Sequence, residues 1–311
     1  MPLFEIDKEN INSVEYTNFR NERQLQRLVE KNLDTIFSCR FVASEFSTGT
    51  QHGGRIDTLA LSEDNNPVII EYKKVESSEL INQSLFYLSW IHDHRGDFEI
   101  AVQKQLGHGI EIDWSDVRVI CIAPGYRKYD LHAVKVMEAN IELWRYRLFS
   151  NSNLYFEEIY KQTYAENSPS PSDGKNPIMV AAGKKAAITR ATGSYTFEQH
   201  LEGKSEKITD LARSLQDYIL GLDSSIEQAP KKLYIAYKTS QNIVCMEIQQ
   251  RKILLFLKLK STDIKEPPSI YRDVTNIGHF GTGQTEFTVS SENHLEVVKA
   301  YIEQAYRKVG G

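Results

Sequence analysis

Residues 55–73 read Arg-Ile-Asp-Thr-Leu-Ala-Leu-Ser-Glu-Asp-Asn-Asn-Pro-Val-Ile-Ile-Glu-Tyr-Lys, and this stretch decides the fold of the first half of the chain. Two apolar segments flank a polar run at residues 62–66, whose composition is typical of a hairpin turn. Side chains two apart on a strand share a face, so Glu71 and Lys73 project together. Antiparallel pairing across the turn can bring Asp57 beside Glu71. The sequence therefore predicts a hairpin on which two carboxylates and an ammonium group converge.

The surroundings of these charges are apolar. The flanking residues, which predict a sheet buried on both faces, are Ile56, Leu59, Leu61, Val68, Ile69 and Ile70. Buried carboxylates need a metal ion or another compensating partner. We therefore expect a metal-dependent phosphodiesterase site in which Asp57, Glu71 and the Tyr72 carbonyl bind the metal. Ligands that are all oxygen favour Mg²⁺ or Mn²⁺.

The chemistry follows from charge. Phosphodiester hydrolysis builds negative charge on the phosphate oxygens, which a divalent metal stabilises. Lys73 would orient the attacking water or help to deprotonate it. The alternative interpretation is an exposed Glu71–Lys73 strand pair with Asp57 near the turn, and such surface pairs contribute little.

Length and charge restrict the function further. The 311 residues suffice for two domains, and no apolar run of 18 residues occurs, so we expect a cytoplasmic protein without a membrane segment. The three distant cysteines, Cys39, Cys121 and Cys245, offer neither a disulfide framework nor a zinc site. Residues 1–164 hold 25 acidic and 18 basic side chains. Any nucleic-acid footprint must therefore be a local basic patch.

The predicted elements of residues 1–164 indicate an α/β domain with a mixed sheet flanked by helices. Apolar spacing predicts an amphipathic helix over residues 20–37, with Asn21 as its N-cap. The other predicted elements are a strand at 40–45, hairpin strands at 55–61 and 67–74, a helix at 79–94, a strand at 117–123, a helix at 130–139, and strands at 141–149 and 154–159.

A domain boundary is predicted where the periodicity stops. Residues 165–195 include Ser-Pro-Ser-Pro-Ser-Asp-Gly and are predicted to be a flexible linker. Residues 196–311 are predicted to form a small α+β domain with a recognition role. Its predicted elements are helices at 202–222 and 291–308 and strands at 232–237, 242–249, 252–260 and 285–289.

A second motif follows the hairpin, because Gln83 and Tyr87 lie four residues apart and share one face of the predicted helix. With this motif, residues 20–125 resemble the PD-(D/E)XK nuclease superfamily, especially its RecB-like and mismatch-endonuclease branches. Asp57 matches the first acid of the motif, and Glu71 and Lys73 match its E-x-K. Gln83 and Tyr87 match the Q-x-x-x-Y signature of that branch.

The resemblance implies a restriction-endonuclease-like fold and a metal-dependent endonuclease that cuts nucleic acid, with DNA favoured over RNA. Glu22 would correspond to the glutamate of the first helix in that branch and would hold a metal-bound water. Gln83 and Tyr87 would position the site or the nucleic-acid backbone. Arg55-Ile56 stand before the first acid where the motif has proline. The alternative is a catalytically inactive nuclease fold that binds nucleic acid or takes part in an assembly.

The C-terminal part resembles an uncharacterised bacterial domain, over about residues 200–309, that often follows such nuclease domains. A protein partner bound through this domain, and a homodimer, are both compatible with the sequence, and neither is required by it.

Two weaker patterns have ordinary structural explanations. His92 and His94 could suggest a metal pair, but residues two apart on a helix diverge, and a solvated helix end is favoured. Tyr234, Tyr237 and Lys238 could line a nucleic-acid surface together with Arg251. Their alternation fits a half-buried sheet equally well.

Overall fold

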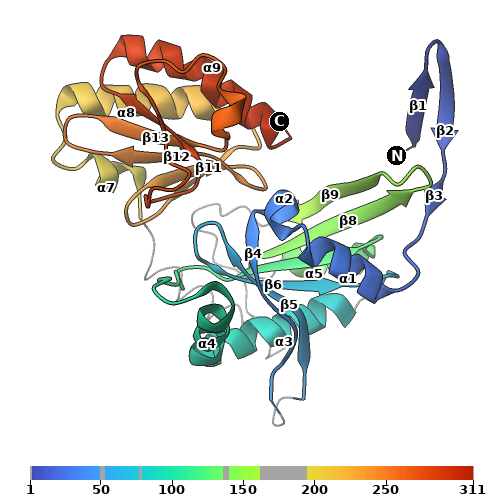
Figure 1. The fold of residues 1–311 in the computed structure, drawn as a ribbon. Helices are drawn as coiled ribbons and strands as arrows, with labels where there is room; N and C mark the ends of the chain where they lie inside the picture. The colour runs from blue at the N-terminus through green and yellow to red at the C-terminus, as the bar shows by residue number, and fades with distance from the viewer. Residues whose placement is uncertain (1, 50–52, 77–78, 136–139, 162–194, 311) are drawn as a thin grey trace. The chain divides into compact units, whose positions relative to one another are not determined.

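The structure is a computed structural model, and it describes residues 2–49, 53–76, 79–135, 140–161 and 195–310. The chain divides into two compact units, residues 1–193 and 194–311, which are described separately (Figure 1). Most of the predicted linker at 165–195 lies outside the described residues.

The first unit is built on a mixed sheet of seven strands. In spatial order these are β3 (Tyr16–Thr17), β8 (Ile141–Phe149), β7 (Arg118–Ala123), β6 (Pro67–Tyr72), β5 (Arg55–Ser62) and β4 (Cys39–Ser47), while β9 (Leu154–Lys161) pairs with β8. The pairs β6–β7 and β7–β8 are parallel, and the other pairs are antiparallel. The polar run at residues 62–66 joins β5 to β6 as predicted, with Asn65 at a φ of 64°.

Helices cover both faces of this sheet (Figure 1). They are α1 (Glu22–Glu30), α2 (Leu33–Phe37), α3 (Glu79–Asp93), α4 (Arg95–Leu106) and α5 (Lys128–Lys135). On one face, Leu25 and Val29 of α1 pack against Ile70 and Tyr72 of β6. On the other, α3, α4 and α5 pack against alternate residues of β5, β6 and β7, such as Leu59, Ile69 and Val119. Burial on both faces explains why β6 is apolar throughout.

The predicted helix over residues 20–37 was wrong in one respect, because it is two helices. Asn21 caps α1 as expected, since its side chain accepts from the Gln24 N–H at 2.9 Å. The helix ends at Lys31, and α2 begins after Asn32. Asn32 donates its side-chain amide to the Leu28 carbonyl, so it ends the first helix by competing for a helical acceptor.

Four elements of the first unit were not predicted. They are α4, the two-residue strand β3, and the strands β1 (Leu3–Asp7) and β2 (Asn10–Val14), which form a two-stranded sheet of their own. The strands β1 and β2 are almost entirely exposed and show no strict alternation of apolar and polar residues, and α4 has its apolar residues on no single stripe, so periodicity gives no signal for these elements.

The second unit is an α+β domain with an antiparallel sheet of six strands. Their spatial order is β10 (Glu227–Pro230), β11 (Ile235–Lys238), β12 (Asn242–Ile248), β13 (Ile253–Leu257), β15 (Thr285–Val289) and β14 (Tyr271–Asp273). Its helices are α7 (Phe197–Leu201), α8 (Glu206–Leu220) and α9 (Glu292–Lys308), and α8 and α9 pack on one face (Figure 1). The predicted helix at 202–222 is therefore shorter than expected and follows a separate turn of helix, which the Thr196 capping box begins.

The aromatic surface considered for this unit does not form. The Tyr237 side chain is fully buried beneath the helices, whereas Tyr234 belongs to a small cluster on the other face of the sheet. Alternation in a half-buried strand explains both residues. Among the described residues of the chain, no helix is long and apolar enough to cross a membrane.

Candidate active site

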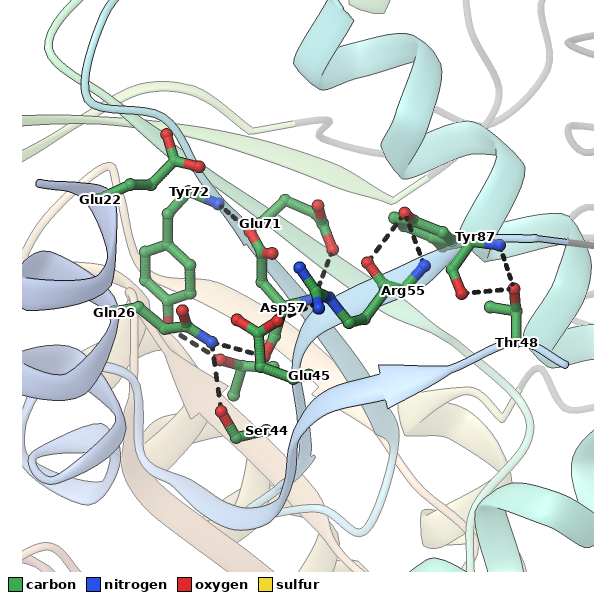
Figure 2. Close-up of polar contacts among 12 residues, drawn as sticks. Glu22, Gln26, Ser44, Glu45, Thr48, Arg55, Asp57, Glu71, Tyr72 and Tyr87 are labelled. Carbon is green, nitrogen blue, oxygen red and sulfur yellow. Dashed lines mark hydrogen bonds and ion pairs between the residues drawn. The ribbon is translucent and has the colours of Figure 1, made fainter.

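The predicted carboxylates lie where β5 and β6 separate. The antiparallel ladder runs from Leu61↔Pro67 to Thr58↔Ile70 and then stops. Beyond it, the side chains take over the main-chain hydrogen bonds, as Figure 2 shows. The Asp57 N–H donates to Glu71 Oε1 at 3.0 Å, and the Tyr72 N–H donates to Asp57 Oδ2 at 3.0 Å. Each carboxylate therefore holds the other strand, and both are fixed at the point of separation.

Electrostatics make this pair unfavourable when both groups are ionised. Burial raises the pKa of Asp57 from 3.8 to about 6, although the Tyr72 N–H and Lys73 lower it. Burial, and next the charge of Asp57, raise the pKa of Glu71 well above 4.5. Glu71 is only 2% exposed. A buried acid beside a half-buried acid whose charge disfavours its ionisation is a site that a cation would stabilise.

Lys73 lies at the end of β6 with Glu22 of α1 as its partner. Its Nζ is 3.8 Å from Glu22 Oε1, and the Lys74 N–H donates to Glu22 Oε2 at 3.0 Å. The neighbouring Lys74 turns away, because its own Nζ donates to the Arg20 carbonyl. The structure thus brings Glu22 and Lys73 close to the carboxylate pair, where β5 and β6 separate.

A buried amide behind the pair fixes the position of β5. Gln26, one turn after Glu22 on α1, is 5% exposed and donates to the Asp57 carbonyl at 2.8 Å. Its amide also contacts Ser44 Oγ and Glu30 Oε1, each at 3.2 Å. The main chain of Asp57 is therefore held by side chains from two other elements. Gln26 was not among the predicted site residues, although its four-residue spacing from Glu22 on the helix was a usable signal.

The predicted pair on α3 is placed on the same side of the site. The Tyr87 hydroxyl donates to the Arg55 carbonyl at 2.9 Å and accepts from the Arg55 N–H at 3.3 Å (Figure 2). Burial and the charge of Glu71 raise the pKa of Tyr87, which also indicates that Glu71 lies near. Gln83 lies one turn earlier on this face, and its buried Oε1 has no hydrogen-bond partner among the described residues.

The loop before β5 fits closely against α3. A Cβ on Gly54 would lie 2.9 Å from the Tyr87 ring and 3.0 Å from Thr48 Oγ1, so only glycine fits without a shift. Thr48 Oγ1 accepts from the Gly54 N–H at 2.9 Å, and the Trp90 indole donates to the Thr48 carbonyl at 3.1 Å. These contacts attach the β4–β5 hairpin to the helix that carries Tyr87.

One ion pair beside the carboxylates was not predicted. Arg55 Nε lies 2.6 Å from Glu45 Oε2, and the two side chains are 68% and 30% exposed. The β4–β5 register passes from Ser44↔Thr58 to Phe46↔Ile56, so Glu45 faces Asp57. Glu45 has a left-handed φ of 54°, which is uncommon for glutamate and which no sequence pattern reveals. Arg55 could have been found, since it stands two residues before Asp57 on the same strand.

The two histidines do not form a metal pair. His94 stacks on Trp90, with ring centroids 4.7 Å apart, and its Nδ1 lies 2.8 Å from the Trp90 carbonyl oxygen. Within the described parts of the chain, no three side chains of His, Cys, Asp or Glu come together as a metal-binding group. A metal at the Asp57–Glu71 pair would need further ligands from the main chain or from water.

Comparison with known proteins gives one full-length relative. An uncharacterised protein of Haemophilus influenzae (strain Rd) is 30% identical over 311 residues, which is 99% of this chain and 100% of the relative. Residues 197–308 match a family described as a domain of unknown function (DUF5655), which confirms the expected uncharacterised C-terminal domain.

Solved structures match only in part. A complex of EndoMS with double-stranded DNA is 16% identical, with 47% of this chain and 64% of that chain covered and a TM-score of 0.30. A repair endonuclease from Pyrococcus abyssi is 14% identical, with coverages of 42% and 48% and a TM-score of 0.25. This chain therefore spans less than two thirds of either of these two solved chains.

Proposed function

The chain belongs to the family of the Haemophilus influenzae protein, and we propose that its first unit is a metal-dependent nuclease that hydrolyses phosphodiester bonds, preferably in DNA. The observation that carries this proposal is the reciprocal Asp57–Glu71 pair at the end of the β5–β6 ladder, with Lys73 beside it. A purely structural role does not account for two neighbouring acids whose pKa values are both raised by burial, with the charge of Asp57 adding to the cost of ionising Glu71.

The residues present fit a divalent cation. Asp57 and Glu71 would hold it, the Tyr72 carbonyl would add a third oxygen, and the Gln83 Oε1, unpartnered among the described residues, is suited to accept from a bound water. All of these groups are oxygens, which suits Mg²⁺ or Mn²⁺. When bound, the metal supplies charge stabilisation for the phosphate and a more acidic water.

The protein's own side chains have distinct tasks in this proposal. Lys73 orients the attacking water and exchanges a proton with it, while Glu22 holds the ammonium in place from α1. Gln26 fixes the main chain that carries Asp57. Tyr87 and Gln83 position the site from α3. The second unit, with its unassigned domain, would recognise a protein partner.

Cleavage of a mixed substrate panel tests the proposal. The panel contains single-stranded, duplex, branched and mismatched DNA and also RNA, each with Mg²⁺, with Mn²⁺ or with EDTA. We expect cutting that needs the metal and that falls by about 10²- to 10⁴-fold in Lys73→Ala, the range typical of a lost proton-transfer group. Lys104→Ala is the matched control, since Lys104 is an exposed lysine in the last turn of α4.

The competing function is nucleic-acid binding or assembly without catalysis. Binding of the panel without any cutting, unchanged in Lys73→Ala, would favour it and would refute the nuclease. Cutting that persists in Lys73→Ala would show that the activity arises elsewhere in the chain.

A further inference from the structure

The carboxylate site needs positive charge for a phosphodiester to approach it. Asp57, Glu71, Glu22 and Glu45 all lie at this edge of the sheet. The charges of Glu22 and Glu45 raise the pKa of Asp57, and those of Asp57 and Glu22 raise the pKa of Glu71. Lys73 is already opposite Glu22. A nucleic-acid backbone would meet mostly like charge here, even with a metal bound, unless another cation contacts it.

Arg55 is placed to provide that contact. Arg55 and Asp57 are two residues apart on β5, so their side chains lie on one face, about 6–7 Å apart along the strand. The Arg55 side chain is 68% exposed and meets Glu45 through Nε. Among the described residues, no acceptor contacts its two terminal nitrogens. A guanidinium held by one edge presents the rest of its planar fork to a ligand.

Two neighbouring residues fix the position of Arg55 before any ligand binds. Tyr87 bonds both main-chain polar groups of Arg55, which fixes the start of β5 against α3 (Figure 2). Glu45 aligns the guanidinium from β4, and its left-handed backbone turns it toward Arg55 across the strand pair. Strained backbone of this kind persists where its surroundings enforce it, and functional sites are common places for it.

We propose that Arg55 binds a phosphate of the nucleic-acid backbone next to the Asp57–Glu71 pair, and that Glu45 and Tyr87 are its positioning residues. This inference rests on the proposed function, because it assigns the phosphate contact of that same site. It also gives Tyr87 a defined role, since the hydroxyl acts through Arg55.

Binding without turnover tests the inference. The probes are fluorescent duplex and single-stranded oligonucleotides, and the protein is the full chain carrying Lys73→Ala. The dissociation constant is measured over a range of KCl concentrations for Arg55→Gln, for Arg55→Lys and for Arg213→Gln. Arg213 is the matched control because it forms an exposed ion pair with Glu198 at 2.9 Å in the second unit.

One lost phosphate contact has a recognisable signature. Arg55→Gln should weaken binding by about 10-fold and lower the slope of log K against log salt by about 0.7–0.9. Arg55→Lys should keep the slope, because it keeps the charge, while binding weakens through loss of the fork. Arg213→Gln should change neither quantity. The melting temperature of Arg55→Gln should equal that of its parent, which would exclude a folding defect as the cause of weaker binding. The unchanged slope in Arg55→Lys would show that the lost charge, and not a structural change, lowers the slope.

The outcomes separate this inference from the proposed function, with cutting by the unmutated protein measured in parallel. Cutting together with an unchanged slope in Arg55→Gln would overturn the role of Arg55 alone. Binding without cutting, with the slope reduced, would retain the phosphate contact and overturn the nuclease. A protein that neither binds nor cuts any probe would overturn both.

Discussion

Replacing Asp57 with asparagine should make the metal-free protein more stable at neutral pH, although the residue lies at the centre of the proposed site. Asparagine has the same shape, and its side-chain oxygen can still accept from the Tyr72 N–H that Asp57 holds at 3.0 Å. The substitution therefore removes the charge and keeps the hydrogen bond. It also removes the repulsion that Asp57 exerts on Glu71.

The magnitude follows from the pKa of Asp57. It is raised, chiefly by burial, from 3.8 to about 6, and each pKa unit corresponds to about 1.4 kcal/mol, so the ionised group costs at most about 3 kcal/mol above pH 6. Between those pH values the folded protein binds more protons than the unfolded chain does. Its free energy of unfolding therefore falls as the pH rises from about 4 to about 6. In Asp57→Asn this contribution to the decrease in the free energy of unfolding should be absent.

Thermal unfolding in EDTA at pH 4 and at pH 8 measures the difference. For a unit of this size about 3 kcal/mol corresponds to about 6–12 °C, so Asp57→Asn should melt up to that much higher at pH 8 and about equally at pH 4. Asp7→Asn, at an exposed position of β1, should change little. Added Mg²⁺ should raise the melting temperature of the unmutated protein more than that of Asp57→Asn. A lower melting temperature for Asp57→Asn at pH 8 in EDTA would refute the electrostatic reasoning.

Three further substitutions test the supports of the site by urea denaturation. Gly54→Ala should lower the free energy of unfolding by about 1–3 kcal/mol, because its Cβ would lie 2.9 Å from the Tyr87 ring. Its control, Gly96→Ala in α4, has open space around it and should be neutral or stabilise by up to about 1 kcal/mol. Equal effects of the two substitutions would contradict the close fit at Gly54. Tyr87→Phe leaves the Arg55 N–H and carbonyl without their hydrogen-bond partner, so it should lower the free energy of unfolding by about 1–3 kcal/mol. It should also lower the rate of cutting, and an unchanged rate would argue against a positioning role for Tyr87. Arg118→Met should cost about 3–5 kcal/mol, because it leaves the 2%-exposed Glu142 carboxylate without its counterion, and a cost below about 1 kcal/mol would mean that this carboxylate becomes protonated instead.

Local patterns in the sequence were sufficient for the central hairpin. Alternation, a polar turn and burial on both faces placed Asp57, Glu71 and Lys73 in two adjacent strands. The structure has Asp57 in β5 and Glu71 in β6, whereas Lys73 follows directly after β6. The same logic predicted Asn21 as a helix cap. It missed the break at Asn32, because a side chain competing for a main-chain acceptor leaves the apolar spacing of a helix intact.

The contacts around the site depended on tertiary structure. Asp57 and Glu71 are 14 positions apart in the sequence, and the geometry of a single hairpin predicts their proximity. The contact of Gln26 with Asp57 spans 31 positions, and that of Tyr87 with Arg55 spans 32. No short-range pattern encodes such pairings, because they depend on how helices pack on the two faces of the sheet.

Alternation along a strand is enough to show which chemical groups stand two residues apart, and therefore that acids and a lysine would share one edge. That the two strands separate there, so that each carboxylate takes a main-chain N–H of the other strand, depends on the packing of the whole unit. The same packing also turns Glu45 into the left-handed conformation that meets Arg55. The physical reason is that side-chain alternation is a property of each strand alone, whereas strand separation and backbone strain are held in place by many distant contacts acting together.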